Sequence, residues 1–428
     1  MQKIGIGIVG LGNIGSRLYK EIIAKKTDIG LKTNTNINIV AISAKNINKK
    51  RSFKVNKKIF FKKPLDITKN PKVNILVELI GKSDGISKKI VEAALKNKKH
   101  VITANKALIS KHGDYLTSIA EKNKVNLEFE AAVGGGIPVL RTIKEGLATN
   151  KISKVYGILN GTCNYILSEM ESTKGSFKNV LKKAQNLGYA EPSNPKLDLN
   201  GYDAMAKIRI LSSLAFNKKI SNARVLMEGI EDIETKDIDI ANQLNLRIKL
   251  LGITELINNK LFERVHPCLV KKDAYIANVN GVMNAVVLNG SPVGESVLQG
   301  EGAGPGPTSS ALMSDLLSIL RGNIKFPFGI PSNKRKKVNS YDKNNNFNSL
   351  YLRFEVKDKP GVLSQITKQL AKYKISIARL IQNPDHKKKT ASIIIITHKA
   401  KELNSNKCLK SFKSNKNVLK YPTLIRLL

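Results

Sequence analysis

Charged side chains that could carry out acid–base chemistry gather in one short part of the sequence. Glu191, Asp198, Asp203 and Lys207 fall within 17 positions. A helix is predicted from about Asp203 to Phe216, and on it Asp203 and Lys207 lie four residues apart and share one face. The helix is apolar almost all round, which predicts that Lys207 is buried. A buried acid–lysine pair is costly and is more often functional than a solvated one, so this segment is a candidate catalytic site; a surface ion pair is the alternative.

A second candidate site lies near the start of the chain, where residues 10–15 read G-L-G-N-I-G. In a G-x-G-x-x-G string the first glycine allows a tight turn, the second lets a pyrophosphate approach the backbone, and the third lets helix and strand pack closely. The string follows a predicted strand at 4–9 and opens a predicted helix at 16–25, which is the context that a dinucleotide site requires. An ordinary glycine-rich turn is the alternative. The predicted cofactor contacts in the string are Gly10, Gly12, Asn13, Ile14 and Gly15.

The end of the second predicted strand, residues 38–43, is expected to approach the ribose of the adenosine. An acid at this point would bind the 2′-hydroxyl of NAD, whereas a cation would bind the 2′-phosphate of NADP. Ala44 and Lys45 follow the strand, without an acid. Lys45 therefore favours NADP over NAD, although a lysine at any loop position is common in so lysine-rich a chain.

Strands and helices alternate in the first part of the chain. Predicted strands at 38–43, 73–80, 101–103 and 126–129 are separated by helical patterns that include 86–97 and 115–123. This alternation predicts an α/β fold, with a Rossmann-type parallel sheet over residues 1–130. The sequence further predicts an α+β substrate and dimerisation domain over 131–330, whose last helix returns to the first domain, a linker over 331–349, and a small unit of strands and a helix over 350–428.

The composition is that of a folded globular chain with an unusual charge. Its 428 residues are 41% hydrophobic and 25% charged, and no window has the 18 or so consecutive apolar residues of a membrane span. Without a signal-peptide pattern or paired cysteines, we expect a cytoplasmic protein with neither a disulfide framework nor a zinc module. The formal net charge is +40. The lysines are scattered and lack interleaved aromatic side chains, so a nucleic-acid-binding protein built on a dinucleotide fold is the lesser hypothesis.

Six ordered motifs carry a family resemblance. They are the glycine string, V-I-T-A-N-K-A-L at 101–108, E-A-A-V-G-G-G-I-P at 130–138, N-G-T-C-N-Y-I-L at 160–167, the segment 191–207, and G-A-G at 302–304 before Pro307 and Thr308. The chain resembles homoserine dehydrogenases of the long form, which end in an ACT regulatory domain. The resemblance implies a reversible NAD(P)-dependent reduction of L-aspartate 4-semialdehyde to L-homoserine, on the path to threonine, isoleucine and methionine.

The resemblance also implies a role for each matching residue. Lys207 and Lys106 would converge on the reacting oxygen, with Lys207 as the proton donor and Asp203 orienting it. A lysine donates a proton best when burial or a neighbouring cation lowers its pKa, and two lysines at one site would supply that neighbour. The implied substrate-binding residues, whose acids would hold the substrate's ammonium, are Glu191, Asp198 and Thr162.

Other glycine-rich loops are implied to bind an ion or the cofactor. In the family the loop at 130–137 binds sodium through backbone carbonyls, which here would belong to Glu130, Val133, Gly135 and Ile137. Three consecutive glycines let carbonyls turn inward, although a plain tight turn before a helix is the alternative. The further implied cofactor contacts are Thr103, Lys106 and Gly304.

Cys163 stands where threonine is common in the family, and it suggests a rival activity. A cysteine here could be the thiolate nucleophile of a phosphorylating aldehyde dehydrogenase. That chemistry needs a base to activate the thiol, and none of the five histidines has an evident pairing with Cys163 in the sequence. It is therefore the lesser alternative.

The last part of the chain resembles an ACT domain, a small ferredoxin-like βαββαβ fold. The match covers a strand at 352–356, the turn D-K-P-G at 358–361, and a helix that ends near residue 372. Backbone N–H groups at the start of that helix are suited to an amino-acid carboxylate, and the family's effector is often threonine. Gln382 and Asn383 are candidate contacts. The alternative is an ACT domain that only makes subunit contacts, in a homodimer or homotetramer.

Overall fold

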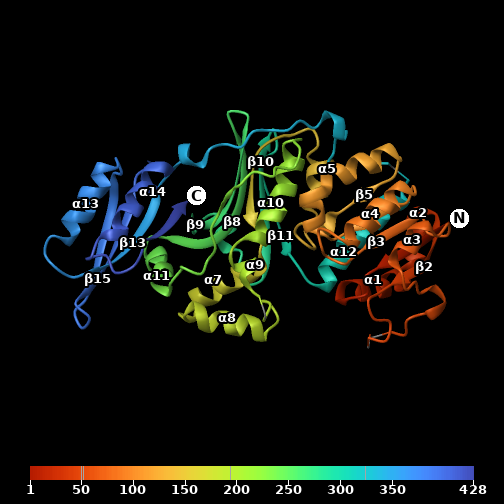
Figure 1. Cartoon of the computed structure of the whole chain (residues 1–428), viewed down its shortest axis with the longest axis horizontal. Helices are drawn as coiled ribbons and strands as arrows, with labels where there is room; N and C mark the ends of the chain where they lie inside the picture. The colour runs from red at the N-terminus through yellow and green to blue at the C-terminus, as the bar shows by residue number, and fades with distance from the viewer. Residues whose placement is uncertain (50, 52, 193, 323) are drawn as a thin grey trace.

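The computed structural model describes residues 1–49, 51, 53–192, 194–322 and 324–428. The chain forms three parts in a row, with the N-terminal part at the right of Figure 1 and the C-terminal part at the left. The part between them is built on a large sheet, and its helices lie on the side of that sheet nearest the viewer.

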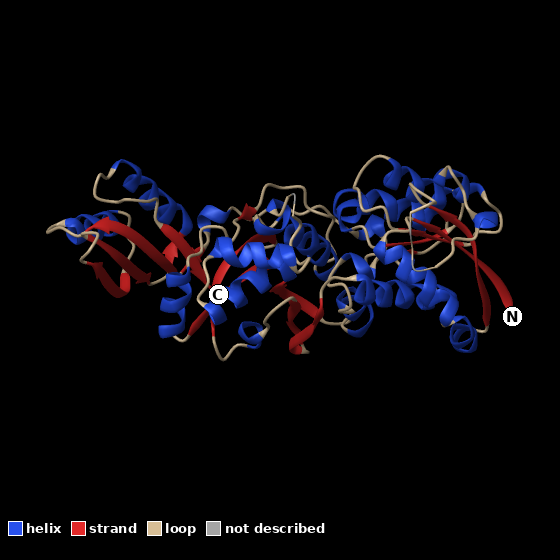
Figure 2. Cartoon of the chain, turned by 90° about the horizontal axis from the view of Figure 1, so that it is seen from below, coloured by secondary structure: helices blue, strands red, loops and turns tan. Residues whose placement is uncertain are grey.

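The N-terminal part is a parallel sheet between layers of helices (Figure 2). Its strands lie in the order β2-β1-β3-β4-β5, and every neighbouring pair is parallel. Alternate residues of β1 and β3, such as Val9 and Leu76 or Ile8 and Val77, pack into two separate apolar clusters, so both faces are covered. This confirms the predicted Rossmann-type sheet. The elements are β1 (Gln2–Val9), α1 (Asn13–Ala24), α2 (Lys26–Thr33), β2 (Thr35–Ser43), α3 (Pro64–Lys69), β3 (Ile75–Glu78), α4 (Ile86–Lys96), β4 (His100–Thr103), α5 (Lys106–Lys122) and β5 (Leu127–Glu128).

Two helices of this part bear on the site. Helix α12 (Pro305–Leu320) comes late in the sequence, and its Leu312 and Leu316 pack in the same cluster as Ile8 and Leu18. Helix α5 was expected only at 115–123 but begins at Lys106. The earlier start places Lys106 directly beyond the C-terminal end of β4.

The central part is an α+β unit, as predicted. Its main strands follow the order β11-β10-β6-β8-β9 with antiparallel neighbours. Helices α7 and α10 pack against the sheet, and their Ile166, Ile208 and Leu211 share a buried cluster with Val155 of β6. The elements are α6 (Val139–Arg141), β6 (Lys151–Ile158), α7 (Gly161–Thr173), α8 (Phe177–Asn186), α9 (Lys196–Leu199), α10 (Tyr202–Ala215), β7 (Leu226–Met227), α11 (Thr235–Gln243), β8 (Leu246–Ile257), β9 (Lys260–Lys271), β10 (Met283–Ser291) and β11 (Gly294–Glu301).

The C-terminal part has the βαββαβ order of an ACT domain. Its sheet order is β17-β13-β15-β14, with all neighbours antiparallel. Phe354 and Ile366 lie in its own apolar cluster. The elements are β12 (Phe347–Asn348), β13 (Leu350–Lys357), α13 (Val362–Lys372), β14 (Ile377–Asp385), β15 (Thr390–Thr397), β16 (Ala400–Lys401), α14 (Glu402–Ser411) and β17 (Thr423–Leu427).

The central and C-terminal sheets are one continuous sheet. Strand β17 pairs with β13 on one edge and, in parallel, with β9 on the other. Buried polar contacts reinforce the junction, since Arg353 of β13 donates to Asp237 of α11 at 2.6 and 3.1 Å. Tyr351 donates to the same carboxylate at 2.7 Å. The C-terminal part is therefore a fixed extension of the central sheet, which the sequence did not indicate.

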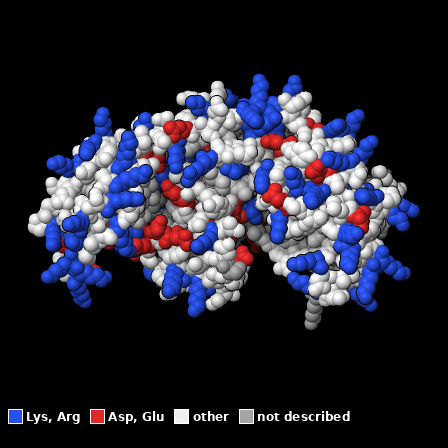
Figure 3. Space-filling model, viewed as in Figure 1, with Lys and Arg blue, Asp and Glu red and all other residues white. Residues whose placement is uncertain are grey.

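The predicted linker at 331–349 is anchored to the body of the protein. Its Arg335 is buried, pairs with Asp114 of α5 at 2.8 Å and lies over the ring of Phe328 at 4.0 Å. On the face shown in Figure 3, lysine and arginine side chains are spread over all three parts. Among the described residues, no helix has the length and apolar character needed to cross a membrane.

Candidate active site

Lys207 occupies the buried face of α10, as the apolar pattern of that helix predicts. The residue is 7% exposed. Its ammonium donates hydrogen bonds to the carbonyl of Leu159 at 2.6 Å and to Asp203 at 2.7 Å. An ammonium carries three hydrogens, so these two bonds use two of its N–H groups.

Lys106 reaches the same carboxylate from the N-terminal part. Its ammonium lies 3.0 Å from the other oxygen of Asp203. The turn before it is held by buried contacts, because Thr103 donates to Glu78 at 2.7 Å and the N–H of Asn105 donates to Thr103 at 3.0 Å. Asn105 also caps α5. The N-terminal and central parts therefore meet at Asp203, and the hydroxyl of Thr103, predicted as a cofactor contact, supports the turn that presents Lys106.

Asp203 lies between two ammonium groups, and this sets the pKa values around it. Burial alone would raise the pKa of Asp203, but the charges and hydrogen bonds of Lys207 and Lys106 hold that pKa far below its usual range. In return, the charge of Asp203 raises the pKa of Lys106 against the effect of burial. Lys106, the expected neighbouring cation, therefore stays positively charged beside the shared carboxylate.

Asn160 joins the two acids of the site, a role that the sequence analysis missed. It caps α7, where its amide oxygen accepts the N–H of Cys163 at 2.8 Å. Only the oxygen can accept that bond, so the NH₂ group must face the other way. This group donates to Asp198 at 2.8 Å and to Asp203 at 3.1 Å. In the sequence, Asn160 is only part of the motif at 160–167, and nothing there indicates its contacts with the two acids.

The three residues assigned to the substrate lie in different surroundings. Asp198 is in α9, and burial and the charge of Asp203 raise its pKa against the hydrogen bond from Asn160. Thr162 donates from its hydroxyl to a backbone carbonyl, that of Tyr189, at 2.5 Å. This bond ties the start of α7 to the segment that continues to the exposed Glu191. The structure thus joins Asp198 to Asp203 through Asn160, while the substrate contacts of Asp198, Thr162 and Glu191 all stay predictions.

The glycines of the N-terminal string have the geometry that their spacing predicts. Gly10 has a φ of +104°, and a Cβ there would lie 2.7 Å from a backbone oxygen of Leu79. A Cβ on Gly15 would lie 1.9 Å from the carbonyl of Gly10, so α1 and β1 are in contact. A Cβ on Gly12 would meet nothing within 4 Å. A pyrophosphate therefore fits beside Gly12, at the N-terminus of α1.

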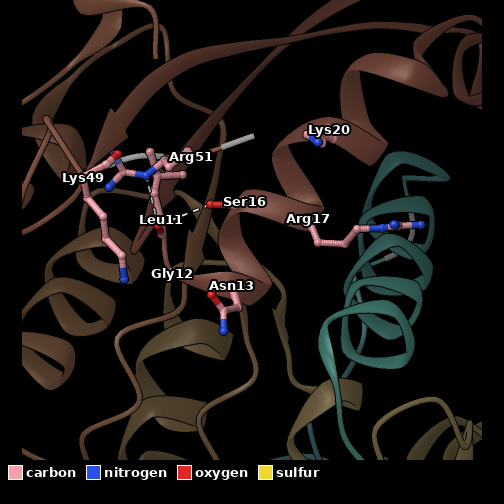
Figure 4. Close-up of a pocket in the computed structure, with 8 residues that line it drawn as sticks. All are labelled: Leu11, Gly12, Asn13, Ser16, Arg17, Lys20, Lys49 and Arg51. Atoms are coloured by element: carbon pink, nitrogen blue, oxygen red, sulfur yellow. Dashed lines mark hydrogen bonds between the residues drawn. The ribbon is translucent and has the colours of Figure 1, made fainter. Parts of the chain in front are cut away.

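A cavity of about 340 Å³ opens at this point, and its lining includes Gly12 and Asn13 (Figure 4). Lys49 and Arg51, from the loop after β2, lie on the far side of Gly12 from α1. Arg51 is fixed there by a hydrogen bond of 3.2 Å to the carbonyl of Leu11. Lys45, which was predicted to bind a 2′-phosphate, is exposed and is not part of the lining. The cations of the lining are Arg17, Lys20, Lys49 and Arg51, and binding of a 2′-phosphate by Lys45 stays a prediction.

The loop at 130–137 has the backbone form that a carbonyl site needs. Gly134 and Gly135 have φ values of +76° and +54°, and a Cβ on Gly135 would lie 2.5 Å from the backbone of Gly302. The carboxylate of Glu130 accepts two backbone N–H groups of α6, at 2.9 and 2.8 Å. Its side chain is thus occupied, and the main-chain oxygens fit a hard cation better.

Gly304 is the N-cap of α12 and has a φ of +111°, a backbone conformation that favours glycine.

Cys163 does not have the surroundings of a nucleophile. The side chain is fully buried, and burial raises the pKa of its thiol well above the usual value. The Sγ–H donates to the carbonyl of Asp198 at 3.3 Å. The neutral thiol is therefore favoured, and the thiolate alternative is rejected.

The cofactor loop and Lys106 follow the C-terminal ends of β1 and β4 in one parallel sheet, the edge at which such sheets bind ligands. A substrate oxygen near Asp203 would meet two ammonium donors close to this edge. The fold and the site define a nicotinamide-dependent oxidoreductase.

Comparison with known proteins gives the family. Residues 138–317 match the homoserine dehydrogenase family, residues 10–130 match the homoserine dehydrogenase NAD binding domain, and residues 350–414 match the ACT domain. The homoserine dehydrogenase of Neisseria gonorrhoeae is 38% identical over 100% of this chain and 99% of its own. That of Pseudomonas aeruginosa is 35% identical over 98% of this chain and 97% of its own. The chain belongs to the homoserine dehydrogenase family.

Solved structures agree. The homoserine dehydrogenase from Thiobacillus denitrificans matches with a TM-score of 0.92 at 35% identity, over 100% of this chain and 99% of that one. The protein is thus an oxidoreductase that acts on a CH–OH group with NAD(P), and its ACT domain indicates an amino-acid effector. The predicted fold class and enzyme activity are confirmed, and the oxidoreductase hypothesis prevails over the nucleic-acid one. Cofactor preference, sodium, the effector and the oligomeric state stay predictions.

Proposed function

We propose that Lys207 donates the proton to the aldehyde oxygen when L-aspartate 4-semialdehyde is reduced to L-homoserine. The bound nicotinamide supplies the hydride. Two N–H groups of Lys207 are held by Leu159 and Asp203, and the third is directed to the substrate oxygen. Lys106 donates to the same oxygen from the other side of Asp203. The single observation that carries this proposal is the buried Lys207–Asp203 pair, which Lys106 completes from the other domain.

Asp203 orients both lysines through its two carboxylate oxygens. In the direction of oxidation, the neutral amine of Lys207 takes the proton of the homoserine hydroxyl, and the charge of Asp203 stabilises the ammonium that forms. The carboxylate raises the pKa of Lys106, so Lys106 remains a cation that stabilises negative charge on the substrate oxygen.

The carboxylates of Asp198 and Glu191 hold the substrate's ammonium, and Thr162 adds a hydrogen bond. Asp198 is suited to this role because Asn160 fixes one of its oxygens and Asp203 repels it. An ammonium that binds at Asp198 offsets this repulsion, so substrate binding and ionisation of Asp198 favour each other.

The preferred cofactor in this proposal is NADP, with NAD as the weaker substitute. Lys49 and Arg51 line the cavity beside Gly12. The guanidinium of Arg51 donates four hydrogen bonds to backbone carbonyls, so it offers a phosphate its charge and one remaining N–H. Lys45 follows β2 directly and adds positive charge to the same loop. This assignment replaces one lysine by a cluster of cations around the 2′-phosphate.

A sodium ion in the loop at 130–137 is also proposed, with the carbonyls of Glu130, Val133, Gly135 and Ile137 as its ligands. The positive-φ glycines support it, since they turn consecutive carbonyls away from the paths of ordinary secondary structure. The ion would rigidify the loop that packs against Gly302, two residues before Gly304.

Threonine is the proposed effector, bound at the N-terminus of α13, where Gly361 has a φ of +85°. Gln382 and Asn383 are exposed on β14 and available to such a ligand. Because β14 ends the continuous sheet, its outer edge can pair with a second chain, in keeping with a homodimer or homotetramer. A cytoplasmic location is proposed, where NADP and the substrate are available.

The proton-donor role is tested with Lys207→Met and a matched control, Lys111→Met, which removes an exposed lysine of α5. Reduction of NADP by L-homoserine is followed by absorbance. We expect turnover of Lys207→Met to fall by about 10³-fold, within the range for losing a general acid, with cofactor affinity unchanged by fluorescence titration. The control should match the wild type. Turnover in Lys207→Met above a tenth of the wild-type value would contradict the role of Lys207.

A further inference from the structure

A buried arginine on strand β17 contacts a segment that packs next to the proposed substrate site. Arg426 lies on β17, opposite Cys268 of β9, and its side chain is 3% exposed. Its guanidinium makes two hydrogen bonds to Glu228, at 2.6 and 3.0 Å, and two to Glu402, at 2.5 and 3.2 Å. Glu402 begins α14 of the ACT domain, whereas Glu228 directly follows β7 of the central part. Arg426 therefore joins acids of two domains.

The segment that carries Glu228 packs against helix α9, which carries Asp198. Two residues beyond Glu228, the N–H of Ile230 donates to the carbonyl of Leu199 at 3.2 Å. Leu199 is the neighbour of Asp198 in α9. Gly229 lies between Glu228 and Ile230 and is in close contact with Leu199, because a Cβ on Gly229 would lie 2.3 Å from the carbonyl oxygen of Leu199. The two segments are in backbone contact, without a flexible side chain between them.

Strand β9 holds both segments from the other side. The carbonyl of Val265 accepts the N–H of Glu228 at 2.8 Å. The same residue limits Gly201, whose φ is +83° and whose Cβ would lie 2.9 Å from a methyl of Val265. The N–H of Gly201 donates to the carbonyl of Asp198 at 3.1 Å. Asp198 is thus enclosed between β9 and the segment that Arg426 grips.

We propose that Glu228 is a positioning residue for the substrate's ammonium site and that Arg426 of β17 holds it in place. The proposal rests on the role given above to Asp198. Arg426 is buried and binds both carboxylate oxygens of Glu228, whose side chain is 37% exposed. A bidentate arginine–carboxylate pair is short and stiff, and the contact from this segment to Leu199 is made by backbone. A displacement of Glu228 therefore moves Leu199 and with it the carboxylate of Asp198.

The same geometry predicts which kinetic constant responds. Lys207 is anchored by Asp203 of its own helix and by the carbonyl of Leu159, and the amide of Asn160 links Asp203 to Asp198. A shift of Asp198 acts directly on the binding of the substrate's ammonium, whereas it reaches the proton donor only indirectly, through Asn160 and Asp203. KM for homoserine should change more than kcat. If binding of an effector to the ACT domain moves β17, the same contacts would displace Asp198.

The test compares Glu228→Gln with Glu402→Gln in the full-length protein. Each variant removes one carboxylate charge from Arg426 and keeps the shape of the side chain, but only Glu228 contacts the segment next to Asp198. We expect Glu228→Gln to raise KM for L-homoserine about tenfold with kcat within about threefold of the wild type. Glu402→Gln should lower the melting temperature and leave KM unchanged. KM for NADP should be unchanged in both.

Gly229→Ala tests whether KM depends on the position of the Glu228 segment or on the charge of Glu228. It alters no charge and pushes directly on the carbonyl of Leu199, so it should raise KM for homoserine in the same way. If Glu228→Gln melts below the assay temperature, the KM of Gly229→Ala alone tests the positioning role. Wild-type KM in the folded variants, or an equal rise in Glu402→Gln, would overturn the positioning role. A wild-type protein that does not oxidise homoserine would instead refute the proposed function.

Discussion

Replacing Asn160 by aspartate is the sharpest probe of how the two acids of the site are held together. Aspartate caps a helix about as well as asparagine and has nearly the same shape, so the bond to the N–H of Cys163 is retained. The change removes the NH₂ group that donates to Asp198 at 2.8 Å and to Asp203 at 3.1 Å. In its place stands a carboxylate that both acids repel.

The size of the effect follows from these two bonds. A hydrogen bond to an ionised group contributes about 1.5 to 3 kcal/mol. Loss of both bonds therefore costs about 3 kcal/mol or more, and a factor of ten corresponds to about 1.4 kcal/mol, so kcat/KM for homoserine should fall about 100-fold at pH 8. The loss should lie mainly in KM, because Asp198 serves substrate binding.

The pH dependence separates this role from simple capping. The groups that face Asp198 are Lys106 from α5, Asp203 and Lys207 from α10, and the amide of Asn160. At lower pH the introduced carboxyl binds a proton and can again donate a hydrogen bond, so the ratio of variant to wild-type kcat/KM should rise as the pH falls. Asn160→Ser, which keeps the cap but is too short to reach both acids, should lose activity with no such rise. Wild-type activity of Asn160→Asp at pH 8, in a protein with an unchanged melting temperature, would refute the reasoning.

Two further predictions concern the cofactor loop and stability. Arg51→Gln should raise KM for NADP about tenfold and leave KM for NAD unchanged, while Lys45→Gln has a smaller effect; initial rates with both cofactors measure this, and equal losses with NAD would remove Arg51 from 2′-phosphate recognition. Lys249 of β8 is 1% exposed, and burial lowers its pKa to about 8. At pH values between this pKa and the higher pKa of Lys249 in the unfolded chain, the unfolded chain binds more protons than the folded one. The free energy of unfolding should therefore rise by about 2 kcal/mol from pH 8 to pH 10, measured relative to Lys249→Met. Urea unfolding at several pH values measures it, and a flat difference would show that the buried ammonium is not destabilised.

The sequence by itself determined the parts of this protein that depend on local pattern. The spacing of Gly10, Gly12 and Gly15 dictates a turn, an open approach and a close helix contact, because each requirement acts within six residues. The apolar face of α10 likewise required that Lys207 be buried and that Asp203 share its face, since helical periodicity alone sets both. These predictions needed no knowledge of the rest of the chain.

Tertiary structure decided what depends on segments that are far apart in the sequence. The meeting of Lys106 with Asp203, the bridge that Asn160 makes between two carboxylates, and the position of Arg51 beside Gly12 follow from how α5, α7, α10 and the loop after β2 pack together. The pairing of β17 with β9 is of the same kind, because a strand edge can pair with any strand of compatible geometry and carries no sequence code for its partner. The residue types indicated the chemistry of this enzyme. Which side chains lie close enough to carry it out together depends on the packing of elements that are far apart in the sequence.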